Sequence, residues 1–400
     1  MTDQSGMGDG ITGGADRAQL ILVGALVLAV SLVGIALVLN SAIFAENLAT
    51  RASQGETGEA DSFEEAASRG GTGSVAYLNA NNGSHSSYGH LEGDLRTTIR
   101  EWSGLQVRDR ARRGQYVDAE YVEGSVVNGT RVVQDDGGEF VPRDEKEGII
   151  GGVLDNAVDL VTDSSWALTP QASNIRDFTM TVRRDGIGDG TTVYAEGNVS
   201  TFLGKLTTST SLSADDPRPF TMVYDVNDDG SYNHAVAVYR PDDGDGDSND
   251  VKFTYYDTST GSTTTCEIDD APATFDVDVS AGVVEGGEGT CDEVFDFQSE
   301  TEDPYQLIFV EGEEIEGDYD FVVDVKKSEL RNDYETGILS PLTYDFESYY
   351  YRHSDGHGQS YTEDSPHVEP AIYSAEVGIS YRSSSVGYNA TVRAAPNEPG

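Results

Sequence analysis

Positive charge is the property this sequence has least of. Its 400 residues include 25 Lys and Arg against 71 Asp and Glu, for a formal net charge of -46. Binding to phosphate backbones needs clustered Lys and Arg, so we expect no nucleic-acid partner. Such acidity is typical of proteins that work in molar salt, where a Debye length of roughly 3 Å at about 1 M screens self-repulsion. Intrinsic disorder is the rival interpretation, and strand-like alternation through the second half argues against it. The lysines are Lys146, Lys205, Lys252, Lys326 and Lys327.

Cysteine is nearly absent, with only Cys266 and Cys291 in the chain. In a domain that faces the cell exterior we predict that these two pair. The ring they close corresponds to a stabilisation on the order of 3 kcal/mol in the chain-entropy model. Two buried free thiols are the alternative.

Recognisable catalytic motifs are also missing. The chain has no His-Glu-x-x-His, no Gly-x-Ser-x-Gly and no phosphate-binding glycine loop ending in Lys-Ser or Lys-Thr. Adjacent carboxylates such as Glu313 and Glu314 recur throughout, so none can be singled out as a glycosidase pair. We therefore predict that the protein is not an enzyme.

One long apolar stretch, Gln19–Phe44, stands out near the start, and no charge falls between Arg17 and Glu46. As a helix it would measure about 39 Å, enough to cross a hydrocarbon core of roughly 30 Å. We predict a transmembrane helix over 19–44 that follows a cytoplasmic leader over 1–18, with the lipid bilayer as partner. The large acidic region after it favours an extracellular C-terminus.

The residues Asp16-Arg17-Ala18 followed by Gln19-Leu20 resemble the class III signal of archaeal type IV pilins and pilin-like proteins. The wider stretch over residues 15–55 looks like the N-terminus of an uncharacterised haloarchaeal pilin-like membrane family. The resemblance implies cleavage between Ala18 and Gln19, an exported anchored protein of no known activity, and other pilin-like subunits as partners. Val23 stands where bacterial pilins carry a glutamate.

Four glycosylation sequons agree with an extracellular location, and they begin at Asn82, Asn128, Asn198 and Asn389. We therefore expect a glycoprotein, although so short a pattern also arises by chance.

The rest of the chain divides by pattern into a stalk with mixed helices and strands over 45–165 and a β-rich domain over 166–400. Helices are predicted over 91–113 and 147–162 from apolar residues at helical spacing. A break is expected over 54–61 and a loop over 70–87, because both are rich in glycine. The fold class is α+β: one N-terminal transmembrane helix, a short helical region and a mainly antiparallel, β-sandwich-like extracellular domain. Alternation predicts strands over 178–182, 192–195, 220–224, 235–239, 251–256, 274–279, 305–310, 319–325, 372–381 and 388–392.

The one basic cluster runs from Arg108 to Arg113 at the end of a predicted helix. It is suited to anionic headgroups or to the acidic surface of a neighbour. A solvated helix face paired with the protein's own carboxylates is the favoured interpretation.

Metal-ligand patterns occur in two acidic turns. Asp225, Asn227 and Asp229, with Gly230 after them, match the first half of a calcium loop, but Val236 stands at the position of its bidentate glutamate. The run over 243–250 has the same alternation. Solvated hairpin turns are the favoured interpretation of both, with calcium as the alternative. His353, His357 and His367 with Asp355 could make a zinc site, but an exposed polar loop is the favoured interpretation. The tyrosines over 349–351 could offer an aromatic surface to a sugar or a partner, but packing on alternate strand faces is favoured.

These patterns lead to one functional prediction. The protein is a non-enzymatic, pilin-like, membrane-anchored cell-surface protein with a structural, adhesive or pilus-accessory role. The alternative is a membrane-tethered extracellular binding protein for calcium, a sugar or a partner ectodomain.

Overall fold

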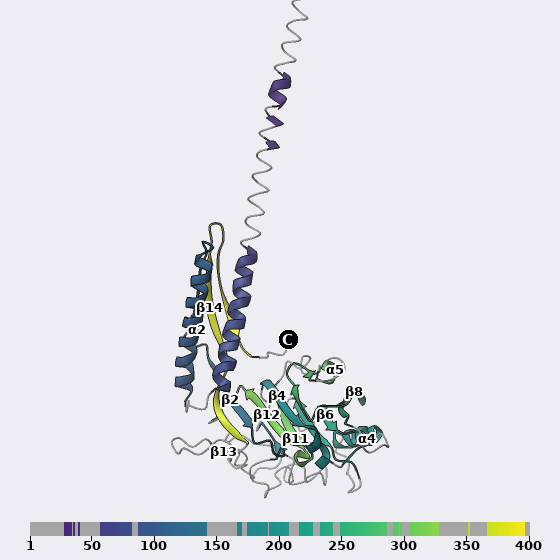
Figure 1. Cartoon of the computed structure of the whole chain (residues 1–400). Helices are drawn as coiled ribbons and strands as arrows, with labels where there is room; N and C mark the ends of the chain where they lie inside the picture. Colours follow the sequence, from purple (N-terminus) through teal and green to yellow (C-terminus); the bar gives the residue numbers. More distant parts are fainter. Residues whose placement is uncertain are drawn as a thin grey trace, which may run out of the picture.

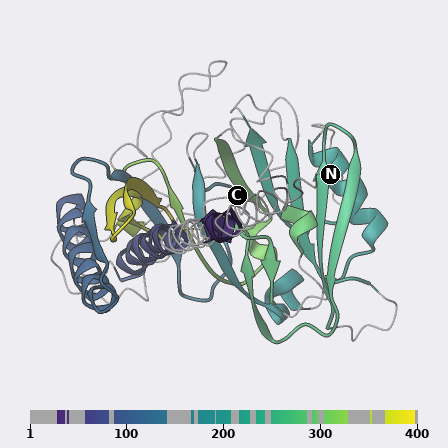
Figure 2. The same cartoon turned by 90° about the horizontal axis from the view of Figure 1, so that it is seen from above.

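The chain folds into an elongated stalk and a β-rich body, seen in a computed structural model (Figure 1). The structure describes residues 28–33, 35–36, 39–40, 57–81, 87–141, 166–169, 174–190, 192–207, 216–226, 233–242, 249–285, 291–295, 297, 304–327, 351–352 and 366–396. Viewed from above, the stalk helices and the hairpin of β14 and β15 lie to one side of the body (Figure 2).

The described helices are an α-helix over 57–80, α2 (Tyr88–Ala111), α4 (Glu196–Thr207), α5 (Asp292–Phe295) and the 3-10 segments η2 (Arg184–Gly190) and η3 (Gly312–Glu314). The strands are β1 (Tyr116–Tyr121), β2 (Val127–Gln134), β3 (Trp166–Ala167), β4 (Ile175–Arg183), β5 (Phe220–Val226), β6 (His234–Tyr239), β7 (Val251–Asp257), β8 (Ser262–Ile268), β9 (Thr274–Asp278), β10 (Val283–Val284), β11 (Tyr305–Val310), β12 (Gly317–Val323), β13 (Tyr351–Arg352), β14 (His367–Arg382) and β15 (Gly387–Ala394).

The strands form two mainly antiparallel sheets, which pack as a sandwich in the body. One is nine-stranded, in the order β1-β14-β2-β12-β4-β9-β10 with β13 and β15 also paired to β14, and the other is six-stranded, in the order β3-β11-β5-β6-β7-β8. Alternate residues of both sheets point into one large core, as expected for strands of period two. Its centre is aromatic, with Phe140 4.9 Å from Tyr319 and 5.6 Å from Phe220 between ring centroids.

Helix α4 adds a third layer on the outer face of the six-stranded sheet. Val199, Phe202, Leu203 and Leu206 form an i, i+3, i+4, i+7 stripe that packs on the residues of β5, β6 and β11 that face away from the main core. The central strands are therefore apolar on both faces, because both faces are covered.

The stalk has its own smaller core. Helix 57–80 and α2 both pack on one face of a three-stranded sheet made of β1, the second half of β14, and β15. Phe63 and Leu95 contribute from the two helices, and Val377 and Val392 contribute from the sheet. The stalk is thus assembled from both ends of the described chain, with the body inserted between them.

Glycines let the stalk elements approach closely. A methyl group on Gly70 would lie 2.6 Å from the Trp102 ring, and one on Gly71 would lie 2.9 Å from the Cβ of Ala394. Gly73, one turn further on, has nothing within 4 Å of such a methyl group.

Strand β14 joins the two cores. Its first half pairs with β2 in the body, and its second half lies between β1 and β15 in the stalk. The register shifts between Ile372 and Ser374, at the junction. There the buried side chain of Asn79 accepts a hydrogen bond from Ile372 N (2.9 Å) and donates one to Ile372 O (2.8 Å), so it takes the place of a neighbouring strand.

The sequence prediction of a mainly antiparallel, sandwich-like fold with some helices is confirmed. The predicted helix over 91–113 is α2, and nine of the ten predicted strands are present. Three expectations fail. Residues 57–80 are helical instead of containing a break and a loop, 192–195 are not a strand, and the division at residue 166 does not separate the two cores, because β14 and β15 belong partly to the stalk. The helix predicted over 147–162 lies outside the described residues.

Candidate functional site

The sequence-predicted calcium residues are only partly described. Asp225 lies near the end of β5, opposite Gln306 of β11, and is 2% exposed. Asn227 and Asp229 lie outside the described residues, as do residues 243–248 of the second acidic run. The structure therefore places Asp225 in the interior of the six-stranded sheet.

A different acidic group does come together at the open end of the hairpin of β7 and β8. Carboxylate oxygens of Asp250, Glu267 and Asp269 all lie within 4.8 Å of one another. The register of the two strands brings this group together. Val251 pairs with Ile268, so Asp250, Glu267 and Asp269, which flank this pair, lie close to one another. Sequence alone could not align two strands to this accuracy.

One lysine already neutralises part of this group. Lys252 Nζ lies 3.4 Å from Glu267 and 3.3 Å from Glu196 on α4. Burial lowers the pKa of Lys252, but the two glutamates outweigh that effect and raise it. The group offers three carboxylates, fewer ligands than the six to eight that calcium takes, and one of the three, Glu267, is already paired with the Lys252 ammonium.

A partly buried ionic network crosses the outer face of the nine-stranded sheet. Arg131 of β2 donates from Nε to Asp320 of β12 (2.9 Å), and its Nη1 lies 3.4 Å from Glu369 of β14. His367 Nε2 is 3.7 Å from the same Glu369. Burial raises the pKa of Asp320, and the opposing effect of Arg131 does not fully offset it. The groups are tied to one another across three strands, which suits a role in holding the sheet together.

The histidine and tyrosine hypotheses are only partly described. His353 and His357 lie outside the described residues, and so do the first two tyrosines of 349–351. His367 is buried in β14 beside Glu369, and Tyr351 begins β13.

The sequons differ in accessibility. Asn198, in the first turn of α4, and Asn389, on β15, are exposed. Asn128 is half-buried in β2, and the Thr130 of its sequon is fully buried. Asn82 lies outside the described residues. Among the sequons that the structure describes, Asn198 and Asn389 are therefore the positions that a glycan could occupy without disturbing the sheets.

The two cysteines are joined. Cys266 of β8 and Cys291, just before α5, form a disulfide with a Cα–Cα distance of 5.6 Å and a sequence separation of 25. The bond ties α5 to the six-stranded sheet, next to the buried Val294 and Phe295.

The apolar stretch over 19–44 is described at ten positions, all helical. Its large side chains are solvent-exposed, with Leu28, Val30, Leu32, Val33, Ile35 and Leu39 between 56% and 65% exposed. Within the described residues, no helix is both long and apolar enough to cross a membrane. The predicted processing positions, Ala18 and Gln19, lie outside the described part of the chain.

The end of the stalk at which helix 57–80 begins is rich in arginine. Arg110 turns inward, since its Nη1 lies 3.2 Å from the carbonyl oxygen of Glu59 and its guanidinium lies 5.1 Å from the Phe63 ring centroid. It is 7% exposed and fixes the end of α2 to the start of helix 57–80.

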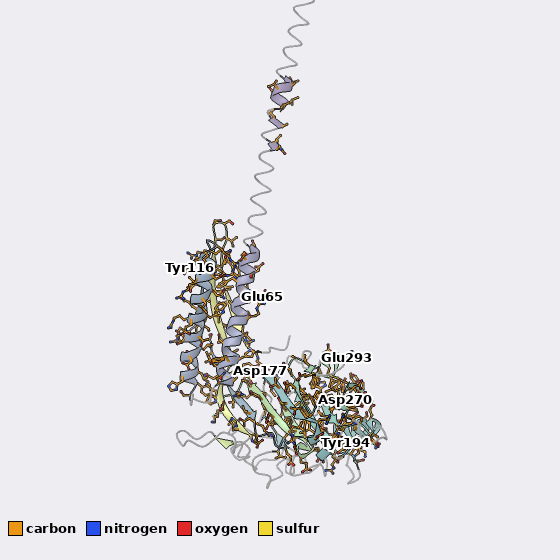
Figure 3. All side chains as sticks on the ribbon, in the orientation of Figure 1. Glu65, Tyr116, Asp177, Tyr194, Asp270 and Glu293 are labelled. Carbon is orange, nitrogen blue, oxygen red and sulfur yellow. A yellow bond between two sulfur atoms is a disulfide. The ribbon has the colours of Figure 1, made fainter. Side chains whose placement is uncertain are left out.

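The other side chains at this end stay at the surface. Arg108, Arg112 and Arg113 are exposed at the end of α2, and Arg382 is exposed at the end of β14. Tyr116, which is 53% exposed, begins β1 directly opposite Arg382 and lies in the upper part of the stalk in Figure 3. We call these five residues the stalk apex. The sequence revealed the arginine run of α2, whereas Arg382 joins it only through strand register.

Comparison with known proteins gives one match. A family model described as a family of unknown function (DUF7261) matches residues 14–152. The matched segment covers the apolar stretch, both stalk helices, β1 and β2, and stops before β3. No curated protein matches the chain. No solved structure matches it either.

Proposed function

We propose that this protein is a membrane-anchored cell-surface protein of the pilin-like kind. The helix over 19–44 is its anchor, and the stalk and body are displayed outside the cell. Its role is structural or adhesive and requires no catalysis. The alternative role, binding of a ligand by the body, has no comparable support among the described residues, since the acidic group near β8 is already paired with Lys252.

The exposure of the apolar helix carries this proposal. Six large aliphatic side chains between Leu28 and Leu39 are more than half exposed. Each such side chain gains about 1.5–3 kcal/mol when it is removed from water, so a partner of low polarity is strongly favoured. An uncharged run of this length has the dimensions of a bilayer.

Two further features support display on a stalk. Most of the acidic residues belong to the body, which lies at the end of the stalk opposite the start of helix 57–80 (Figure 1). Acidity keeps such a surface soluble. The exposed sequon residues Asn198 and Asn389 are compatible with an extracellular location.

The test is fractionation of cells that express the full chain with a C-terminal epitope tag. We expect the tag in the membrane fraction, released by detergent and retained in alkaline carbonate. Protease added to intact cells should remove it. Recovery of the full chain in the soluble fraction would overturn the proposal.

A matched pair of variants controls for the effect of added charge. Leu32→Arg with Ile35→Arg places two charges in the anchor, each costing about 3 kcal/mol of insertion free energy, and should move the protein out of the membrane fraction. Tyr77→Arg with Leu105→Arg makes the same change at stalk residues of similar exposure and should leave fractionation unchanged.

Mass spectrometry of the mature N-terminus tests the pilin-like part separately. A terminus at Gln19 is the result expected from pilin-type processing. An intact Met1 on a membrane-bound protein would leave a plain signal anchor.

A further inference from the structure

Charge is distributed very unevenly along the molecule. Residues 127–371, which include the body, hold 53 Asp and Glu against 14 Lys and Arg. The stalk segments over 57–124 and 372–396 hold 12 against 9. The stalk is therefore close to neutral, and its positive charge is concentrated at one end.

The apex arginines surround that end. Arg108 and Arg112 lie one turn apart on the exposed face of α2. Arg382 follows the buried Tyr381 in β14, so it stands on the sheet face opposite the helices. None of these three makes an ion pair with another residue in the described part of the chain. Arg113 lies 3.4 Å from Asp109, with its side chain still 57% exposed.

We propose that the stalk apex rests on the anionic headgroups of the membrane that holds the anchor. This inference depends on the proposed function, since it names the surface that the anchored stalk touches. Guanidinium groups bind phosphate through paired hydrogen bonds, and tyrosine is enriched at the headgroup level of membranes.

The short distance along the chain between the anchor and the stalk apex indicates that the surface in contact with the apex is the membrane. The described helix begins at residue 57, and its start lies at the apex, as the contacts of Arg110 and Arg113 with Glu59 show. Only residues 45–56 separate this point from the end of the apolar stretch. Twelve residues reach from about 18 Å as helix to about 40 Å when extended, so the apex lies within reach of the bilayer surface.

Shape and charge favour a flat anionic surface over a neighbouring protein. Arginines on opposite faces of the stalk end cannot enter one concave site together, but they can meet one plane. Helix 57–80 holds the body about 36 Å further away, beyond the reach of the screened surface potential, so the body's negative charge does not oppose the contact.

Hydrogen exchange of the full chain in nanodiscs tests this arrangement. Discs of phosphatidylcholine alone are compared with discs that contain phosphatidylglycerol. We expect slower exchange over residues 108–118 and 380–388 in the anionic discs only. An arginine at an anionic surface contributes roughly a five-fold preference, so Arg108→Gln, Arg112→Gln and Arg382→Gln together should weaken the contact about a hundred-fold and abolish the difference.

The control variant removes the same charge elsewhere, by Arg69→Gln, Arg100→Gln and Arg183→Gln, and should keep the lipid-dependent protection. If the chain inserts into both kinds of disc and the hydrogen exchange of the apex segments is equal in both, the apex contact is overturned and the anchor is not. Protection that depends on two copies per disc and not on lipid charge also overturns it, and points to the acidic body of a neighbour. Failure of the chain to insert overturns the anchor and the apex contact together.

Discussion

Replacement of Gly71 by alanine tests the close packing on which the stalk depends. In an exposed helix this change stabilises by about 1 kcal/mol, because alanine loses less backbone entropy. At Gly71 the new methyl group would lie 2.9 Å from the Cβ of Ala394 and 3.2 Å from Val377. Both neighbours are buried in the sheet, so relief requires the helix and the sheet to separate by several tenths of an ångström.

The expected magnitude follows from two opposing effects. Overpacking of a tight core costs typically 1–3 kcal/mol. Set against a propensity gain of about 1 kcal/mol, it gives Gly71→Ala a net effect between about zero and a loss of about 2 kcal/mol. Gly73→Ala has open space and should gain about 1 kcal/mol in the same helix. The two variants should therefore differ by about 1–3 kcal/mol, with Gly71→Ala the less stable.

Tryptophan fluorescence can measure this difference in the stalk. Trp102 stacks on Phe63 with ring centroids 6.3 Å apart, so its emission reports on the packing of the stalk helices. Trp166 belongs to the body and is removed by Trp166→Phe in every sample. Denaturant titrations then compare the two glycine variants with the parent. Equal stabilisation by Gly71→Ala and Gly73→Ala would refute the close contact.

Three other predictions concern polar groups. The Asn79 pair uses the same titration, and the Arg131 and Asp257 variants, which lie in the body, are measured in a Trp102→Phe background in which Trp166 is the probe. Asn79→Ala leaves a buried N–H and a buried C=O of β14 unpaired and should cost about 3 kcal/mol, whereas Asn81→Ala, whose side chain bonds an exposed carbonyl, should change stability by less than about 0.5 kcal/mol. Arg131→Met strands the two carboxylates it holds and should cost about 3–5 kcal/mol, whereas Arg183→Met breaks an exposed pair and should cost less than about 1 kcal/mol. Burial raises the pKa of Asp257, but hydrogen bonds from its own turn outweigh this and lower it below 3.8. Its stabilising contribution is therefore present above pH 3.8 and lost as the pH falls toward the lowered value, and Asp257→Asn should reduce the loss of stability measured between pH 5 and pH 3.

Alternation made most of the body predictable. The residues over 305–310 read as a strand because the segment is apolar and β-branched, and β11 has those bounds. Strand β8 was missed because Ser262-Thr-Thr-Thr contains no apolar residue, and it forms an edge of the six-stranded sheet. Helix α4 was predictable from the sequence, because Val199, Phe202, Leu203 and Leu206 have helical spacing, but no helix was predicted there.

The stalk and its apex could not be predicted from any single segment of the sequence, because they depend on contacts between segments. Gly70 and Gly71 lower intrinsic helix propensity, and their benefit appears only when Trp102 and Ala394 are packed against them. The orientation of the arginines at the apex also depends on contacts between segments. The α2 arginines are visible in sequence, but Arg110 turns inward because Phe63 and Glu59 lie beneath it.

The path of β14 determines how the body is held. One uninterrupted strand contributes to both the stalk part and the body part of the nine-stranded sheet, and its register shift coincides with the two hydrogen bonds from Asn79. The chain crosses between stalk and body a second time, between β1 and β2. The body is therefore joined to the stalk by two connections. One of them is a continuous strand that is hydrogen-bonded to a stalk helix, so the pair resists rotation of the body far better than a single linker does. In an anchored surface protein, a load on the body would therefore pass through the hydrogen bonds between β14 and its neighbours into helix 57–80. The same strand must keep its pairing for the stalk helices to retain a sheet to pack on, so loss of β14 pairing would release the body and open the stalk core together.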